Sequence, residues 1–121
     1  MLFRSISELV NNCTDSFEEV YEHGDFALWN IGETNNNQLT AFDFEYFIFR
    51  GIENFDLIKY HFLHFYLIKK HKGLKLYNSV KSNIDINNFN TLFLLFIIKE
   101  LLISSNNKYA SDLKNILYIK L

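Results

Sequence analysis

Two histidines in one apolar stretch are the first candidates for chemistry in this sequence. His61 and His64 lie three residues apart in ENFDLIKYHFLHFYLIKKHK, residues 53–72. On one helix, both imidazoles would reach the same metal ion. Zinc sites use three or four protein ligands, and neither a cysteine pair nor an HExxH motif supplies the others. We therefore predict no metal site and no cofactor, and interpret these histidines as helix residues that bond to backbone carbonyls.

Other reactive residues also lack a catalytic arrangement. The all-α ribonucleases of the HEPN group place a histidine four to six residues after an arginine, whereas no histidine follows Arg50 before His61. Cys13 has no histidine or acid placed by a motif to activate it, and it is interpreted as a small core residue. The carboxylates are dispersed, and glycine-rich phosphate loops are absent. The sequence therefore predicts a protein that is not an enzyme.

Composition places the chain among single cytoplasmic domains. Its 121 residues include 13 Phe, 7 Tyr and 1 Trp, and such large rings fill the core of a short chain. The single cysteine excludes an internal disulfide and indicates a reducing compartment. Arg4 and Glu8 interrupt any signal peptide. The longest apolar run, residues 92–98, is far shorter than the ~20 residues that cross a bilayer. We expect a soluble, cytoplasmic protein.

Residues 53–72 predict the helix around which the chain is organised. The stretch is apolar nearly all round, so it must be covered on more than one side. Helical spacing and capping signals predict further helices over residues 2–13, 15–23, 74–81, 89–104 and 109–119, and a short turn or helix over residues 25–31. The four glycines each follow a helical pattern, where a left-handed capping residue is favoured; they are Gly24, Gly32, Gly51 and Gly73.

The segment AFDFEYFIFR, residues 41–50, supports two interpretations. Its aromatic residues alternate with other side chains, which favours a strand. Thr40 and Asp43, however, resemble a helix N-terminal cap, and Ile48 and Ile52 extend a helical stripe. We choose a helix, because a lone strand would have no partner. The sequence thus predicts a single all-α domain over residues 1–121, a helical bundle of about six to eight helices.

Charge is divided unequally along the chain. Residues 1–56 hold eleven carboxylates against Arg4 and Arg50, for a net charge of −9. Residues 57–121 hold ten lysines against three carboxylates, for a net charge of +7. These charges either pair or sit in water, or they create a directional field that attracts a basic partner.

Acidic side chains surround two aromatic residues in the acidic half. Aromatic side chains dominate the energetics of protein interfaces, and carboxylates accept hydrogen bonds from lysine and arginine. The predicted partner-binding residues are Glu18, Glu19, Glu22, Asp25, Trp29, Glu33 and Tyr21.

Lysines 69, 70, 72 and 75 are the opposite candidate, a nucleic-acid contact. They stand in and just beyond the last turn of the predicted central helix, where cations complement the helix dipole. No arginine accompanies them, and the sequence pI is about 6.0. We expect no direct contact with nucleic acid.

A small domain with no catalytic motif and one acidic, aromatic half resembles a bacterial toxin-immunity protein of the contact-dependent-inhibition or bacteriocin type. The resemblance covers size, a composition typical of AT-rich codons, and the acidity of one half. The nuclease-colicin immunity proteins carry a Tyr-Tyr-Pro signature, which this proline-free chain lacks. The resemblance implies a cognate inhibitor that covers the substrate cleft of a basic nuclease toxin. Two alternatives remain: a structural or regulatory interaction module, and a nucleic-acid-associated regulator that uses the lysine-rich half.

Overall fold

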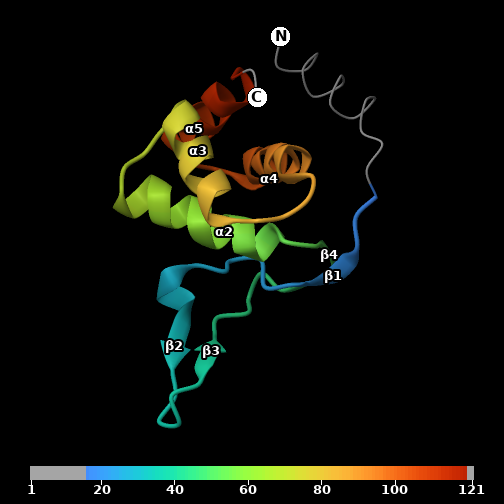
Figure 1. The fold of residues 1–121 in the computed structure, drawn as a ribbon, viewed down its shortest axis with the longest axis vertical. Coiled ribbons are helices and arrows are strands. Elements are labelled where there is room, and N and C mark those ends of the chain that lie inside the picture. The colour runs from blue at the N-terminus through green and yellow to red at the C-terminus, as the bar shows by residue number, and fades with distance from the viewer. Residues whose placement is uncertain (1–15, 120–121) are drawn as a thin grey trace. The chain divides into compact units, whose positions relative to one another are not determined.

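The computed structural model describes residues 16–119, whose contacts divide into two compact units (Figure 1). One unit is Phe17–Lys70, and the other contains residues 71–119. The described residues form a mixed α/β structure, with four α-helices and four antiparallel strands in two small sheets. The prediction of an all-α bundle of six to eight helices is therefore wrong. The predicted helix 2–13, with Cys13, lies outside the described residues.

The Phe17–Lys70 unit contains both sheets and one helical segment. In chain order its elements are β1 (Glu19–Glu22), the 3₁₀ helix η1 (Leu28–Asn30), β2 (Ile31–Glu33), β3 (Leu39–Ala41), β4 (Ile48–Ile52), α2 (Phe55–Leu63) and the π-helix η2 (His64–Ile68). Strand β1 pairs with β4, and β2 pairs with β3. Figure 1 shows the β2–β3 hairpin extending away from β1, β4 and α2 within this unit.

Strand pairing explains why two predicted helices are absent. Residues 15–23 and 41–50 were both expected to be helical, but Glu19 pairs with Ile52 and Glu22 pairs with Ile48 in an antiparallel register. Each strand supplies the backbone partner that the other would lack alone. We rejected the strand interpretation of residues 41–50 because no partner strand was evident, and the actual partner, β1, lies far earlier in the sequence. Residues 48–50 of the segment belong to β4, Ala41 ends β3, and the residues between them form an irregular connection with a turn at residues 45–46.

Two glycines allow close approaches inside this unit and do not cap helices. Gly24 has φ +88°, and a Cβ there would overlap the carbonyl oxygen of Tyr46. Gly51 lies in β4, where a Cβ would overlap the Cβ of Glu22 on β1. Glycine is the only residue without a Cβ, so both positions need it. The prediction that the glycines are helix caps is wrong, since Gly32 lies in β2 and Gly73 begins a helix.

The expected helix over residues 53–72 is confirmed over residues 55–68, as α2 followed by η2. Its buried side chains are Phe55, Ile58, Phe62 and Leu63. The helical segment ends earlier than predicted: Lys70 is the first residue after it in the left-handed conformation, with φ 59°, and Gly73, with φ 54°, begins the next helix.

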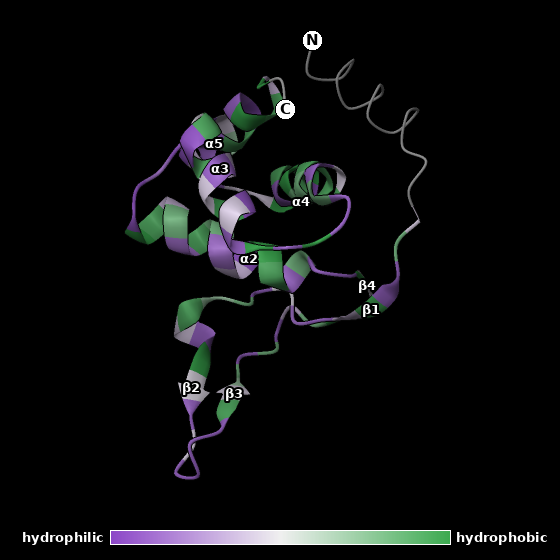
Figure 2. Ribbon diagram, in the orientation of Figure 1, coloured by the Kyte–Doolittle hydropathy of each residue, from purple (hydrophilic) through white to green (hydrophobic). Residues whose placement is uncertain are grey.

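Three helices make up the other described unit: α3 (Gly73–Asn83), α4 (Phe89–Ile103) and α5 (Asn107–Leu117). They confirm the helices predicted over residues 74–81, 89–104 and 109–119. Helix α4 is coloured as apolar on most of its surface in Figure 2. The side chain of Asn106 accepts the backbone N–H of Tyr109 at 2.9 Å, which caps the start of α5. Among the residues described, no helix combines the length and the hydropathy needed to cross a membrane.

Candidate functional site

An exposed group of aromatic rings lies on and beside the β1–β4 sheet. Tyr21 on β1 is 74% exposed and Phe49 on β4 is 72% exposed, although their ring centroids are only 6.1 Å apart. The ring of Phe47 lies 5.8 Å from Tyr21 and 5.0 Å from Phe49. We call these three residues the aromatic surface. Its rings pack against one another and still face solvent, as at many protein-binding sites.

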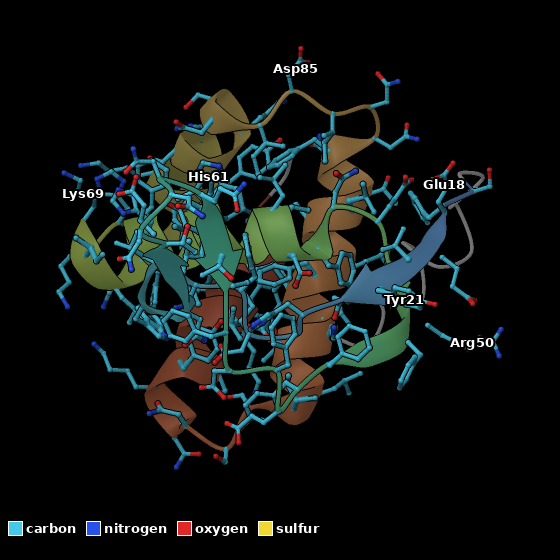
Figure 3. All side chains as sticks on the ribbon, turned by 90° about the horizontal axis from the view of Figure 1, so that it is seen from below. Glu18, Tyr21, Arg50, His61, Lys69 and Asp85 are labelled. Atoms are coloured by element: carbon cyan, nitrogen blue, oxygen red, sulfur yellow. The ribbon has the colours of Figure 1, made fainter. Side chains whose placement is uncertain are left out.

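Carboxylates stand beside the aromatic surface. Glu18 and Glu19 are both exposed at the start of β1, and Glu19 forms an ion pair with Arg50 of β4 at 3.1 Å. Figure 3 shows Glu18 near one end of β1 and the Arg50 side chain extending away from β4. Because the side chains of this ion pair are mostly exposed, water screens it and leaves it weak. The surface therefore combines apolar rings with acidic groups.

A buried histidine, His23, joins the end of β1 to the segment that precedes Phe47 and Phe49. The Nδ1 atom of His23 accepts the backbone N–H of Asp25 at 3.1 Å, and its Nε2 atom lies 2.8 Å from the carbonyl oxygen of Phe42. An amide N–H only donates and a carbonyl only accepts, so the proton of the neutral ring lies on Nε2. The ring centroid is 4.6 Å from that of Phe44, which in turn lies 6.2 Å from Phe47.

Helix α2 holds the same turn through two charged side chains. The Asp56 carboxylate accepts the backbone N–H groups of His23 at 2.7 Å and of Gly24 at 3.1 Å. The Lys59 ammonium donates to the Gly24 carbonyl at 3.1 Å and lies 3.8 Å from the Asp25 carboxylate. Charge-assisted hydrogen bonds of this kind are stronger than neutral ones. The turn after β1 is therefore held both by the His23 ring and by the Asp56 and Lys59 side chains of α2.

The seven residues predicted to bind a partner divide into three groups. Glu18, Glu19 and Tyr21 lie together on β1 or beside it. Trp29 and Glu33 are also exposed, but they lie elsewhere: Glu33 is in β2 of the β2–β3 sheet, and Trp29 is in η1, which directly precedes β2.

The remaining two, Glu22 and Asp25, are less exposed than the others. Glu22 is only 2% exposed, so its carboxylate is not presented to a partner in this conformation. Asp25 accepts the side-chain amide of Asn30 at 3.2 Å and faces Lys59. Glu22 therefore belongs to the interior of the unit, whereas the Asp25 side chain is partly buried and is engaged by Asn30 and Lys59.

Sequence reasoning missed Phe47 and Phe49 as surface residues. The signal was present in the alternation of residues 41–50, which we interpreted as a helix. A strand assignment would have placed Phe49 and Ile48 on opposite faces of the sheet, and would have identified Phe49 as a candidate surface residue.

The histidines show no catalytic or metal-binding geometry. Partial burial and the neighbouring His64 together lower the pKa of His61 below the usual 6.5. Among residues 16–119, no three potential ligands cluster to hold a metal ion. His71 Nδ1 lies 2.8 Å from the Ser79 hydroxyl, but that hydroxyl donates its proton to the Lys75 carbonyl. The imidazole therefore donates to Ser79, which is the reverse of what activates a serine nucleophile.

The four lysines considered for nucleic-acid binding belong to different units. Lys69 and Lys70 are exposed at the end of the Phe17–Lys70 unit. Lys72 and Lys75 begin the other unit, where the Lys72 ammonium lies 3.8 Å from the Asp112 carboxylate. No single described element presents all four together.

Comparison with known proteins adds no relative: no family model, no curated protein and no solved structure matches this chain.

Proposed function

We propose that this protein is a cognate immunity protein, which binds a basic toxin of the nuclease class through its aromatic surface and the adjoining carboxylates. The observation that supports this most directly is the exposure of Tyr21 and Phe49 on paired strands. Covering one such ring on binding is worth roughly 3 kcal/mol, at about 25 cal/mol per Å² of apolar area. Two rings therefore supply the kind of central anchor that protein interfaces use.

The charge of the unit favours a basic partner. The Phe17–Lys70 unit contains nine carboxylates against four lysine and arginine side chains. Two of those cations, Arg50 and Lys59, already face carboxylates of the same unit. An acidic surface accelerates association with a basic protein and repels the phosphates of nucleic acid. Two copies of the same acidic surface also repel each other, which disfavours a homodimer through it.

Nuclease toxins fit this surface because they bind phosphates with lysine and arginine side chains. The carboxylates of the immunity protein would occupy the positions of phosphate charges, and the aromatic rings would supply affinity. The principal alternative is an interaction module whose partner is held by apolar contact alone. Salt distinguishes the two, since ions screen charge attraction and leave apolar contact intact.

The test is a capture experiment with three tagged proteins. Wild type, the double variant Tyr21→Ala/Phe49→Ala and the control Leu102→Ala are incubated with native lysate at low and at high salt. Leu102 is an exposed apolar residue of α4, so its loss matches the chemistry of the double variant at a different surface. We expect wild type and the control to retain one basic protein at low salt, and the double variant to lose it.

The captured protein is then assayed for nuclease activity. The proposal requires stoichiometric wild type to inhibit that activity. Retention by the double variant contradicts the assigned surface. A partner that resists high salt and is not inhibited supports the interaction module instead.

A further inference from the structure

We infer that the β2–β3 hairpin is the inhibitory element, a rigid projection that enters the cation-lined substrate cleft of the partner held by the aromatic surface. The inference rests on the proposed function and assigns binding and inhibition to two different parts of the unit. The aromatic surface supplies binding, and the hairpin, here defined as residues 31–41, supplies inhibition.

The hairpin has the shape that a cleft accepts. Every residue from 33 to 40 is exposed, and Figure 1 shows the hairpin extending from the rest of its unit. Within the described part of the chain its two strands pair only with each other, with Ile31 opposite Ala41 and Glu33 opposite Leu39. A two-stranded ribbon is narrow, so it fits into a concave site that a flat sheet face would only cover.

Hydrogen bonds hold the tip of the hairpin in one conformation. The Thr34 N–H donates to the Gln38 carbonyl at 2.8 Å, and the Asn37 N–H donates to the Thr34 carbonyl at 3.0 Å. The Thr34 hydroxyl also accepts the Gln38 N–H at 3.2 Å. Asn37 has φ 58°, a left-handed conformation that asparagine tolerates. The tip is therefore ordered before binding, which lowers the entropy that is lost on association.

The base of the hairpin is fixed to the rest of the unit. The Phe42 N–H donates to the Asn30 carbonyl at 3.0 Å, which continues the pairing beyond β2 and β3. The buried side chain of Asn30 donates to the Asp25 carbonyl at 2.8 Å. The carbonyl of Phe42 in turn accepts from His23, which follows β1 directly. The hairpin is thus positioned by the same turn that lies beside the aromatic surface.

The side chains of the hairpin match a cleft that binds phosphate. Glu33 is the only charged residue between Asp25 and Asp43, so the hairpin carries one negative charge and no positive charge. Leu39, opposite Glu33, is 80% exposed. A carboxylate next to an apolar side chain complements lysine or arginine, whose charged heads stand on apolar stems. Asn35, Asn36 and Gln38 add amide donors and acceptors at the tip.

Photo-crosslinking tests the position of the hairpin directly. The residue p-benzoylphenylalanine replaces Asn36 at the tip, Phe49 on the aromatic surface, or Lys108 in α5 as a control, each in the full chain. After illumination in native lysate, mass spectrometry identifies the crosslinked protein and peptide. We expect Asn36 and Phe49 to yield the same basic protein and Lys108 to yield none of it. The peptide joined to Asn36 should contain residues of the partner's substrate cleft.

The outcomes separate this inference from the proposed function. Crosslinking from Phe49 without crosslinking from Asn36, or from Asn36 to a convex surface, overturns the hairpin assignment and leaves the aromatic surface in place. Failure at both positions overturns the proposed function together with the inference.

Charge reversal provides an independent measurement on the captured protein. Glu33→Lys should raise the concentration needed for half-maximal inhibition about tenfold or more, the loss expected when a close charge pair is reversed. Thr40→Lys on the neighbouring strand raises the net charge by one, whereas Glu33→Lys raises it by two. An effect of net charge alone would therefore give Thr40→Lys about half the free-energy loss of Glu33→Lys, and a specific contact of Glu33 requires Thr40→Lys to lose clearly less than that. A loss of half or more in Thr40→Lys would show that net charge matters and that Glu33 has no specific contact.

Discussion

The imidazole of His23 accepts a hydrogen bond from the backbone of Asp25, two residues further along the chain, at 3.1 Å. That bond fixes the tautomer, and the opposite ring nitrogen then donates to Phe42. One buried side chain thus joins the end of β1 to the segment that leads into the aromatic surface.

Replacement of His23 should destabilise the Phe17–Lys70 unit. The residue is only 5% exposed, so His23→Ala leaves the Asp25 N–H and the Phe42 carbonyl without their ring partners. We expect a loss of about 2–4 kcal/mol in the free energy of unfolding. Urea denaturation followed by the fluorescence of Trp29, the only tryptophan, measures it. Asn36→Ala at the exposed hairpin tip is the control, and an equal effect there would contradict the role of His23.

A side chain at Gly24 should cost more than one at Gly32. Gly24→Ala combines a positive φ with overlap of the Tyr46 carbonyl, so we expect a loss of at least about 2 kcal/mol. At Gly32 a Cβ would meet only the Phe42 ring at 3.3 Å, and that exposed ring can shift. Gly32→Ala should therefore change stability by less than about 1 kcal/mol. Both variants belong to one unit, so the same fluorescence signal compares them. Similar losses would contradict the close approach at Gly24.

Acid should weaken the fold through His61. Burial and the charge of His64 lower the pKa of His61 in the folded protein, so the unfolded chain binds more protons in that range. The contribution of His61 is negligible well above pH 6.5, and it lowers stability as the pH drops from 6.5 toward the lower folded pKa. The variant His61→Gln should lose less stability on acidification than wild type. Unfolding curves at neutral and acidic pH measure the difference, and identical losses in both proteins would exclude this contribution.

Removal of the Arg50 charge should leave the free energy of unfolding nearly unchanged and accelerate association with the proposed partner. Its ion pair with Glu19 is solvent-exposed, so Arg50→Gln should change the free energy of unfolding by less than about 0.5 kcal/mol. The same change frees an acidic group beside Tyr21 and raises the net negative charge. Association with the proposed basic partner should therefore accelerate about two- to threefold at low salt and be unchanged at high salt. Stopped-flow kinetics measures the rate, and a slower association would contradict an acidic attraction.

The sequence predicted most of the C-terminal helices because their signals are local. The apolar spacing of α4 and the capping side chain of Asn106 are contained within a few residues. Helix α2 was also predicted, although its end was placed too late: Lys70 already adopts a left-handed conformation, and Gly73, which shares that conformation, begins α3 instead of ending α2.

The strands were not predicted because their partners are distant in sequence. Glu19 and Ile52 pair across the whole hairpin region, and neither segment contains the information that the other will lie beside it. Acidic residues on β1 were therefore assigned to a helix surface, which left Glu22 counted as exposed when it is buried against Gly51. Glu18, Glu19 and Tyr21 remain in the proposed site because their side chains are exposed.

Pairing of β1 with β4 also holds the two ends of the intervening chain together. Residues 33–40 lie beyond every contact that fixes the base of the hairpin, so their length and composition are separate from the pairing that closes the unit. Lengthening an exposed loop costs little, because closure entropy grows only slowly with its length. The tip is therefore an exchangeable segment: a library randomised over residues 34–38 should retain the fold, and under the proposed role of the hairpin its members would differ in the partner that they inhibit.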